Sequence, residues 1–265
     1  MTLTVRDVLA TLQGGGETEA AGADRLLAGD LDNAVRAIAV SFMPSYRVIE
    51  EAARVGASLL VVHEGVYYSH RYEPDRFGDD PVILAKQALI ARSGLAIYRC
   101  HDYWHRIRPD RIALGFLRQL GWETFVLRHE PTSSVVVLPS PKTVYDVAMS
   151  LKQRLGLAAV RVVGDLARTC TRIGVTVGYR GGGDHAIPLF LQDGLDLLIV
   201  GEGPEWETPE YVKDAIAQGR GAALVVVGHT ESEVPGMRLL AERLRESFPG
   251  VPVDYVEEQP LFQVL

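Results

Sequence analysis

Two stretches of the chain repeat one pattern, and this repeat constrains the fold more than any other feature. Residues 59–65 read LLVVHEG and residues 197–203 read LLIVGEG, while residues 97–101 (IYRCH) have a counterpart in residues 225–229 (VVVGH). A run of β-branched and apolar residues predicts a buried strand, and the polar residue after it lies at the carboxyl end, where open α/β sheets place their sites. We therefore expect an α/β protein whose binding residues lie at strand ends.

The match extends beyond these segments with a spacing of roughly 130 residues, the size of a domain rather than of a solenoid repeat. It predicts an internal duplication, with a first α/β half at residues 1–127 and a second at residues 128–265. Each half is expected to have a mixed sheet, with a metal site at the interface between the halves. Any two strand–helix units resemble each other, which is the alternative. In both halves, however, a His is followed four residues later by His or Glu, then by Pro and a helix, which favours duplication.

Prolines and apolar runs predict several element boundaries. Pro109 and Pro235 each predict the start of a helix, over residues 109–120 and 235–248, because proline fits a first helical turn. Residues 17–33 are small and acidic and predict a loop or a short helix. Residues 261–265 predict a final strand.

The composition is that of an ordinary globular protein. Of 265 residues, 47% are hydrophobic and 23% are charged, enough for one large domain or two small ones. The formal net charge of -7 argues against nucleic-acid binding, which needs a basic face. No run of about 18 apolar residues occurs, so we expect no membrane span. Cys100 and Cys170 form no CxxC pattern and suit a reducing, cytoplasmic setting.

The segment 228–233 carries the most specific chemical signal. If residues 230–233 form a helical turn, His229 and Glu233 share a face and can point at one ion. Glu231 then lies on another side and is expected to be solvated or capping. Such a His–Glu pair is also common on protein surfaces, so the segment alone does not establish a metal site.

Two further strand ends contribute ionisable residues. His101 and His105 have the same spacing as His229 and Glu233, although a packed loop anchored by Trp104 is the alternative. His63 and Glu64 follow another predicted strand. Adjacent residues at a strand end point in opposite directions, so one ion does not readily take both, but two ions could. Four of the seven histidines fall in these segments, which favours a metal site.

Together these segments resemble the Nif3-like dinuclear-metal family, also known as the type 2 GTP cyclohydrolase I homologues. The resemblance covers nearly the whole chain, and its motifs are Asp32-Asn33, the strand into His63, and residues 101–105, 196–202 and 228–233. It implies two α/β halves, a toroidal homo-hexamer built from dimers, and two divalent metal ions (Zn, Fe or Mn). The ligands that it implies are His63, Glu64, His105, His229 and Glu233.

The sequence departs from the family's pattern at two of these positions. The family has a second His where this chain has Glu64, and an Asp where this chain has His105. The exchange preserves three imidazoles and two carboxylates, so we interpret it as compensating; loss of one or both ions is the alternative. By the family's pattern Glu233 bridges the ions, with His63 and His229 on one ion and Glu64 and His105 on the other.

Two ions about 3.5–4 Å apart can share a water, lower its pKa and clamp both oxygens of a displacement, so hydrolysis is the natural reaction. We expect a metallohydrolase acting on a nucleotide or another small phosphate- or ring-containing molecule, with Glu233, His101 and Glu202 as catalytic residues. Glu202 could orient a ligand or act as a base, or be a solvated loop carboxylate. A metal-dependent binding or scaffold protein without turnover is the alternative, and a nucleic-acid partner is less favoured.

Two remaining features have weaker functional interpretations. Gly181–Gly183 precede a predicted helix and could cradle an anion or simply form a tight turn. His70 and His129 fit no motif and are predicted to be surface residues.

Overall fold

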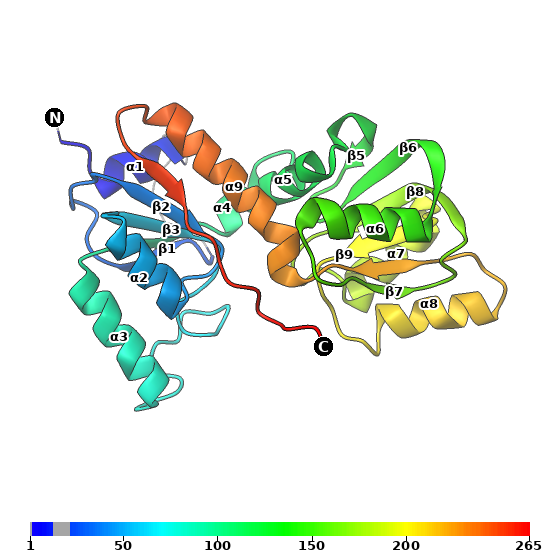
Figure 1. Ribbon diagram of the computed structural model, residues 1–265, viewed down its shortest axis with the longest axis horizontal. Helices are drawn as coiled ribbons and strands as arrows, with labels where there is room; N and C mark the ends of the chain where they lie inside the picture. Colours follow the sequence, from blue (N-terminus) through cyan, green and yellow to red (C-terminus); the bar gives the residue numbers. More distant parts are fainter. Residues whose placement is uncertain (1, 13–21) are drawn as a thin grey trace. The chain divides into compact units, whose positions relative to one another are not determined.

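The computed structural model describes residues 2–12 and 22–265 and divides the chain into two compact units (Figure 1). The first unit comprises the described residues up to Trp104 together with Met237–Leu261, and the second comprises His105–Gly236 and Phe262–Leu265. Each unit has a mixed β-sheet with helices packed on it, so the predicted α/β class is confirmed. Among the described residues, no helix is both long and apolar enough to cross a membrane.

The first unit is built on a five-stranded sheet of order β1-β4-β3-β2-β11, in which β1 is antiparallel and the other strands are parallel. Strands β2, β3 and β4 are buried at every residue because helices cover both faces, α2 and α3 on one and α1 and the end of α9 on the other (Figure 1). Its elements are α1 (Val5–Leu12), β1 (Arg25–Ala28), β2 (Ile38–Ser41), α2 (Tyr46–Arg54), β3 (Leu59–Val62), α3 (Pro81–Ser93), β4 (Ala96–Arg99) and β11 (Val253–Tyr255).

The second unit is built on a six-stranded sheet of order β5-β6-β8-β9-β10-β7, with β8, β9 and β10 parallel and the others antiparallel. Helices α7 and α8 pack their apolar side chains on one face of this sheet. Its elements are α5 (Arg111–Leu120), a 3-10 turn at Glu123–Phe125, β5 (Val126–His129), β6 (Ser134–Thr143), α6 (Val144–Leu155), β7 (Arg161–Val163), β8 (Thr169–Thr176), α7 (Gly183–Asp193), β9 (Leu197–Val200), α8 (Thr208–Ala217) and β10 (Leu224–Val226). Two helices, α4 (Asp102–Arg106) and α9 (His229–Ser247), contain residues of both units.

Both sheets contain the same four-strand arrangement. The order β1-β4-β3-β2 in the first unit corresponds to β7-β10-β9-β8 in the second, because each consists of three parallel strands with an antiparallel strand on the same edge. The repeated sequence segments occupy β3 and β9, and their companions occupy β4 and β10. This agreement between sequence and topology supports the predicted internal duplication.

The compact units nevertheless divide the chain at points other than the predicted boundary between residues 127 and 128. Helix α5 precedes that boundary but belongs to the second unit, where Gln119 Nε2 donates a hydrogen bond to the carbonyl oxygen of Arg154 at 2.8 Å. Strand β11 follows the boundary but pairs with β2 in the first unit. Both assignments depend on contacts between residues far apart in sequence, which the repeat does not encode.

The two helices predicted to begin at prolines begin elsewhere. Helix α5 begins at Arg111 rather than Pro109 because the side chain of Asp110 caps it, accepting hydrogen bonds from the amides of Ile112 and Ala113. Helix α9 begins at His229, six residues before Pro235, so that proline lies inside the helix. The first turn of α9 is held by Ser232, whose hydroxyl accepts from the amide of Gly178 and donates to the carbonyl of His229. Tertiary contacts therefore override the preference of proline for a first turn.

Two strand predictions are also wrong. Residues 261–265 form no strand, and their side chains are exposed. Strand β1 lies in the stretch expected to be a loop or short helix, of which residues 17–21 fall outside the described residues. Its side chains are all half-buried, so no alternation of apolar and polar residues marked it as a strand.

Burial of Lys86 on α3 predicts a pH-dependent stability. Its side chain is 1% exposed and donates to the carbonyl oxygen of Val66, and burial lowers its pKa from 10.5 to about 8. Between these pH values the folded chain has released a proton that the unfolded chain still binds, so stability rises with pH in that window. We expect the unfolding free energy of the wild type, measured relative to Lys86→Met by urea denaturation, to rise by up to about 3 kcal/mol across it.

The matched control for this experiment is Lys213→Met, because Lys213 has an exposed side chain on α8. Its difference from the wild type is expected to stay constant over the same pH range. A constant difference for Lys86→Met as well would contradict the burial effect.

Candidate metal centre

The first turns of α9 bring together the two residues of the most specific motif. His229 and Glu233 lie four residues apart on this helix, and His229 Nε2 is 3.1 Å from Glu233 Oε2. Glu233 is 2% exposed. The predicted helical turn is thus present. It places the buried carboxylate of Glu233 next to the imidazole of His229.

A second imidazole of the same unit faces the other oxygen of the Glu233 carboxylate. His105, on α4, has its Nε2 atom 3.7 Å from Glu233 Oε1. The opposite ring nitrogens are each held by a carboxylate: His105 Nδ1 lies 2.8 Å from Asp110 Oδ2, and His229 Nδ1 lies 2.8 Å from Glu202 Oε1. A histidine whose outer nitrogen donates to a carboxylate is the usual form of a metal ligand, since this contact fixes the tautomer and the ring orientation.

The donor atoms of this group fit a cation by their chemistry. When Nδ1 donates its proton to a carboxylate, a neutral imidazole presents only a lone pair at Nε2. Here two such atoms face the two oxygens of Glu233. Acceptors that face each other need a cation between them, either a proton or a metal ion. Imidazole and carboxylate ligands suit Zn, Fe or Mn.

Asp110 supports this arrangement in two ways. Its Oδ1 atom caps α5, while its Oδ2 atom contacts His105 and accepts a hydrogen bond from Arg180 at 2.9 Å. Burial alone would raise the pKa of Asp110, but the hydrogen bonds and charges of His105 and Arg180 hold it below its usual range. The carboxylate is therefore ionised and able to hold the His105 ring in place.

Backbone at the end of β8 approaches the carboxylate closely. Gly178 has a φ of +62°, and a Cβ atom there would lie 2.2 Å from Glu233 Oε1. At Gly201, the counterpart of His63 in the repeat, a Cβ atom would lie 2.5 Å from the carbonyl oxygen of Gly178 and 2.6 Å from Ser232 Oγ. The second unit thus has no room for a histidine where the first unit carries one.

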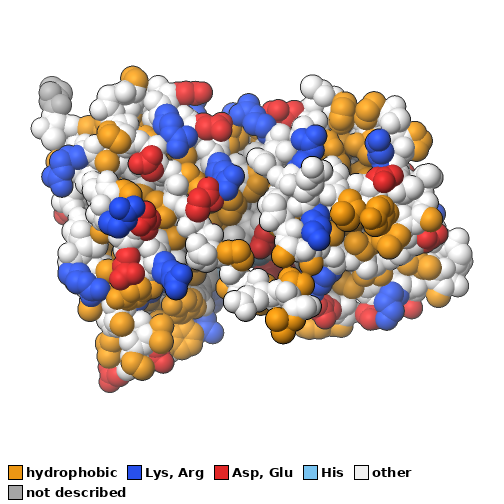
Figure 2. Space-filling model, viewed as in Figure 1, with side chains coloured by type: hydrophobic (Ala, Val, Ile, Leu, Met, Phe, Trp, Pro, Cys, Tyr) orange, Lys and Arg blue, Asp and Glu red, His pale blue; other side chains and the backbone are white. Residues whose placement is uncertain are grey.

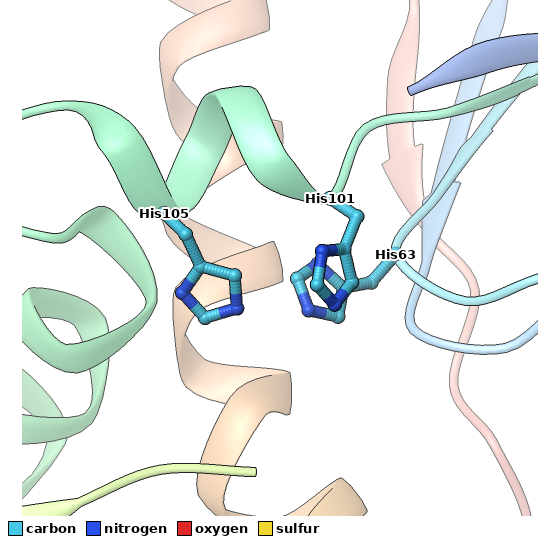
Figure 3. Close-up of side chains that lie close together, drawn as sticks. All are labelled: His63, His101 and His105. Carbon is cyan, nitrogen blue, oxygen red and sulfur yellow. The ribbon is translucent and has the colours of Figure 1, made fainter. Parts of the chain in front are cut away.

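The first unit brings His63 and His101 together at the carboxyl ends of two adjacent parallel strands, β3 and β4. Their rings stack with centroids 4.4 Å apart (Figure 3). His101 Nδ1 lies 2.8 Å from Asp102 Oδ1, again leaving Nε2 as the ligand atom. His105 lies one helical turn after His101 along the chain (Figure 3).

Asp24 fixes the backbone that carries His101. Its carboxylate accepts hydrogen bonds from the amides of His101 and Tyr103, at 2.5 and 2.7 Å. Burial raises the pKa of Asp24. The position of the His101 ring therefore depends on a carboxylate from a loop distant in sequence.

Three residues of the first unit form a group that could hold a metal ion, namely Glu64, His70 and His101. Each offers one donor atom, and these atoms lie within 4.8 Å of one another. The guanidinium of Arg99 also contacts this group, through Glu64 and His70. His70 is exposed, as predicted, but its place in this group was missed, because it lies in a loop and belongs to no motif.

The glycine-rich turn considered as an anion cradle already faces a carboxylate of the chain. The amide of Gly183 at the start of α7 donates to Glu207 Oε2 at 2.6 Å. This contact places the negative charge of Glu207 at the positive end of the helix.

Replacing Asp110 by Asn tests whether the contact with His105 tunes metal binding. Asparagine caps helices as well as aspartate does, so the fold should be retained. It cannot hold the His105 ring as an anion, and we expect the dissociation constant for Zn²⁺, measured by competition with a chelating dye, to rise about 10–100-fold. Asp80→Asn is the matched control, because Asp80 caps α3 through the same two amide contacts. Equal affinities in both variants would contradict the assignment.

Comparison with known proteins supports the resemblance seen in the sequence. The profile of the family described as Duf34/NIF3 (NGG1p interacting factor 3) matches residues 17–260. A GTP cyclohydrolase 1 type 2 homolog of Clostridium perfringens is 24% identical over 227 residues, 83% of this chain and 82% of that protein. A protein of the same name from Deinococcus radiodurans is 29% identical over 231 residues, 84% of this chain and 80% of that protein.

Solved structures show the same fold at low sequence identity. The crystal structure of a Bacillus cereus protein related to NIF3 has a TM-score of 0.78 and 13% identity, covering 100% of this chain and 99% of that one. A hypothetical protein of Staphylococcus aureus has a TM-score of 0.77 and 15% identity, covering 100% of both chains. Since the family profile spans nearly the whole sequence, this chain belongs to the Duf34/NIF3 (NGG1p interacting factor 3) family.

Proposed function

We propose that this protein is a metal-dependent hydrolase whose metal centre is built on Glu233. The observation that carries the proposal is the placement of two imidazole Nε2 atoms opposite the two oxygens of one buried carboxylate, with each imidazole braced by a further carboxylate. Such a braced set is costly to assemble in a protein interior unless a cation is bound.

The proposed centre takes His105, His229 and Glu233 as its ligands, all three from the second unit. At least one divalent ion at Glu233 is required, and a second ion additionally requires Glu64 as a ligand. A bound divalent ion would polarise the substrate and lower the pKa of a water molecule.

The protein's own side chains would orient the reaction. Glu202 is half-exposed and contacts His229 Nδ1, so it would fix that ring and lie near the substrate side. His101 is braced by Asp102 and would act as a further ligand or as a proton carrier. The close backbone of Gly178 would hold the Glu233 carboxylate in one orientation.

The substrate class proposed is a nucleotide or another small phosphate- or ring-containing molecule. Two relatives are named as GTP cyclohydrolase 1 type 2 homologs, which makes GTP the first compound to test. On the face shown in Figure 2, Lys and Arg side chains lie interspersed with Asp and Glu side chains, which does not favour a phosphate backbone as the partner.

The test is to load metal-free protein with Zn²⁺, Mn²⁺ or Fe²⁺ and to screen it against GTP, other nucleotides and phosphoesters. Turnover that requires the metal and disappears in Glu233→Ala, with the fold intact by circular dichroism, would support a hydrolase. Metal binding without turnover of any of these compounds would favour the second candidate, a metal-dependent binding or scaffold protein. The implied homo-hexamer remains a prediction, which light scattering of the purified protein would check.

A further inference from the structure

A buried guanidinium occupies the metal-capable group of the first unit. Arg99, the last residue of β4, is 2% exposed, and an arginine side chain stays charged at any accessible pH. Its Nη2 atom lies 2.8 Å from Glu64 Oε2 and 3.2 Å from His70 Nδ1. The cation thus contacts two of the three residues whose donor atoms converge there.

The guanidinium is fixed in this position by the backbone around it. Arg99 Nε donates to the carbonyl oxygen of His63 at 3.0 Å, and Nη1 donates to the carbonyl oxygen of His70 at 2.6 Å. The planar fork is therefore bound on three sides. Moving it away would break a buried ion pair and leave two carbonyl oxygens without this donor.

The guanidinium of Arg99 disfavours a divalent cation at Glu64. A small cavity beside Arg99 is lined by two further arginines, Arg25 and Arg71, and by one carboxylate, Glu73. A metal ion bound to Glu64 would be repelled by the guanidinium in a poorly solvated setting, where charges interact strongly. At Glu233, by contrast, two imidazoles face the carboxylate.

We infer that Arg99 takes the place of one of the two metal ions implied by the family resemblance, so that each chain holds a single divalent ion. This inference rests on the proposed metal centre at Glu233. It assigns Glu64 to an ion pair with Arg99 rather than to a metal. The exchange of His for Glu at position 64 is then explained by Arg99 and not by compensation among metal ligands.

The test counts metal ions in the full chain. Protein stripped with a chelator is reloaded with excess Zn²⁺, desalted and analysed by mass spectrometry for metal and protein content. The wild type is expected to hold one ion per chain. Arg99→Gln, which removes the charge but keeps a donor, is expected to hold two, and Arg99→Lys, which keeps a charge, is expected to hold one.

A second variant decides the question if Arg99→Gln does not fold. Glu64→Gln in the wild-type background is expected to retain one ion with an affinity within about twofold of the wild type. Two ions in the wild type, one ion in folded Arg99→Gln, or loss of an ion in Glu64→Gln would each overturn the inference while leaving the centre at Glu233 in place. No ion in the wild type would instead overturn the proposed metal centre itself, and the inference with it.

Discussion

Glu233→Gln is expected to abolish metal binding with little change in the metal-free fold. The substitution keeps the shape of the side chain but removes the charge that faces His105 and His229. We expect the affinity for Zn²⁺ to fall at least about a hundredfold, since even residues that only support ligands contribute 10–100-fold. In the wild type, Zn²⁺ at about 100 times its dissociation constant should stabilise the fold by about 2.7 kcal/mol, whereas the variant should gain at most about 0.4 kcal/mol at the same concentration.

The control for this experiment lies two residues away on the same helix. Glu231 is placed over Gly228 at the start of α9, where glutamine serves as a capping residue equally well. Glu231→Gln should therefore retain both the metal and its stabilising effect, measured as the shift in thermal midpoint on adding Zn²⁺. A Glu233→Gln protein that is stabilised by Zn²⁺ as much as this control would disprove the central role of Glu233.

Gly178→Ala is expected to destabilise the protein and to weaken metal binding together. A side chain at a φ of +62° costs about 1–2 kcal/mol by itself. Its Cβ atom would also lie 2.2 Å from Glu233 Oε1, so the carboxylate must move. We expect a total loss of about 3 kcal/mol or more in unfolding free energy, with an affinity for Zn²⁺ reduced about a hundredfold.

Gly194→Ala separates the effect of backbone strain from the effect of a Cβ atom close to Glu233. Gly194 follows α7 with a φ of +59°, and a Cβ atom there would meet nothing within 4 Å. It should cost only the backbone strain and leave metal binding unchanged. If both variants lose the same stability in urea denaturation and bind Zn²⁺ equally well, Gly178 has no special relation to Glu233.

The parts of the fold that the sequence predicts well are those set by local patterns. Strands β3 and β9 coincide with runs of four apolar residues, and every residue of both strands is buried. Helices α3 and α6 end at Gly94 and Gly156, both in the left-handed conformation that glycine adopts freely. Local chemistry decides each of these features within a few residues, so no knowledge of the tertiary structure is needed.

The parts that escaped prediction depend on contacts between distant residues. The sequence places Asp110 inside a helix that begins at Pro109, and only the folded chain shows that Asp110 caps α5 and holds His105. Arg99 lies at the end of a predicted buried strand. Its contacts with Glu64 and His70 join residues that are 35 and 29 positions apart in the sequence. The candidate ligands could be predicted because they follow the ends of predicted strands. The residues that hydrogen-bond to these ligands, such as Asp110, and the residue that pairs with Glu64, Arg99, could not be predicted.

The shared order of four strands in the two sheets makes Glu64 and Glu202 counterparts, and likewise Arg99 and Val227. In the first unit Glu64 forms an ion pair with Arg99, whereas in the second unit Glu202 contacts the ring of His229. The same position of the repeat therefore carries a cation in one unit and an apolar residue in the other, and the two glutamates have different partners as a result.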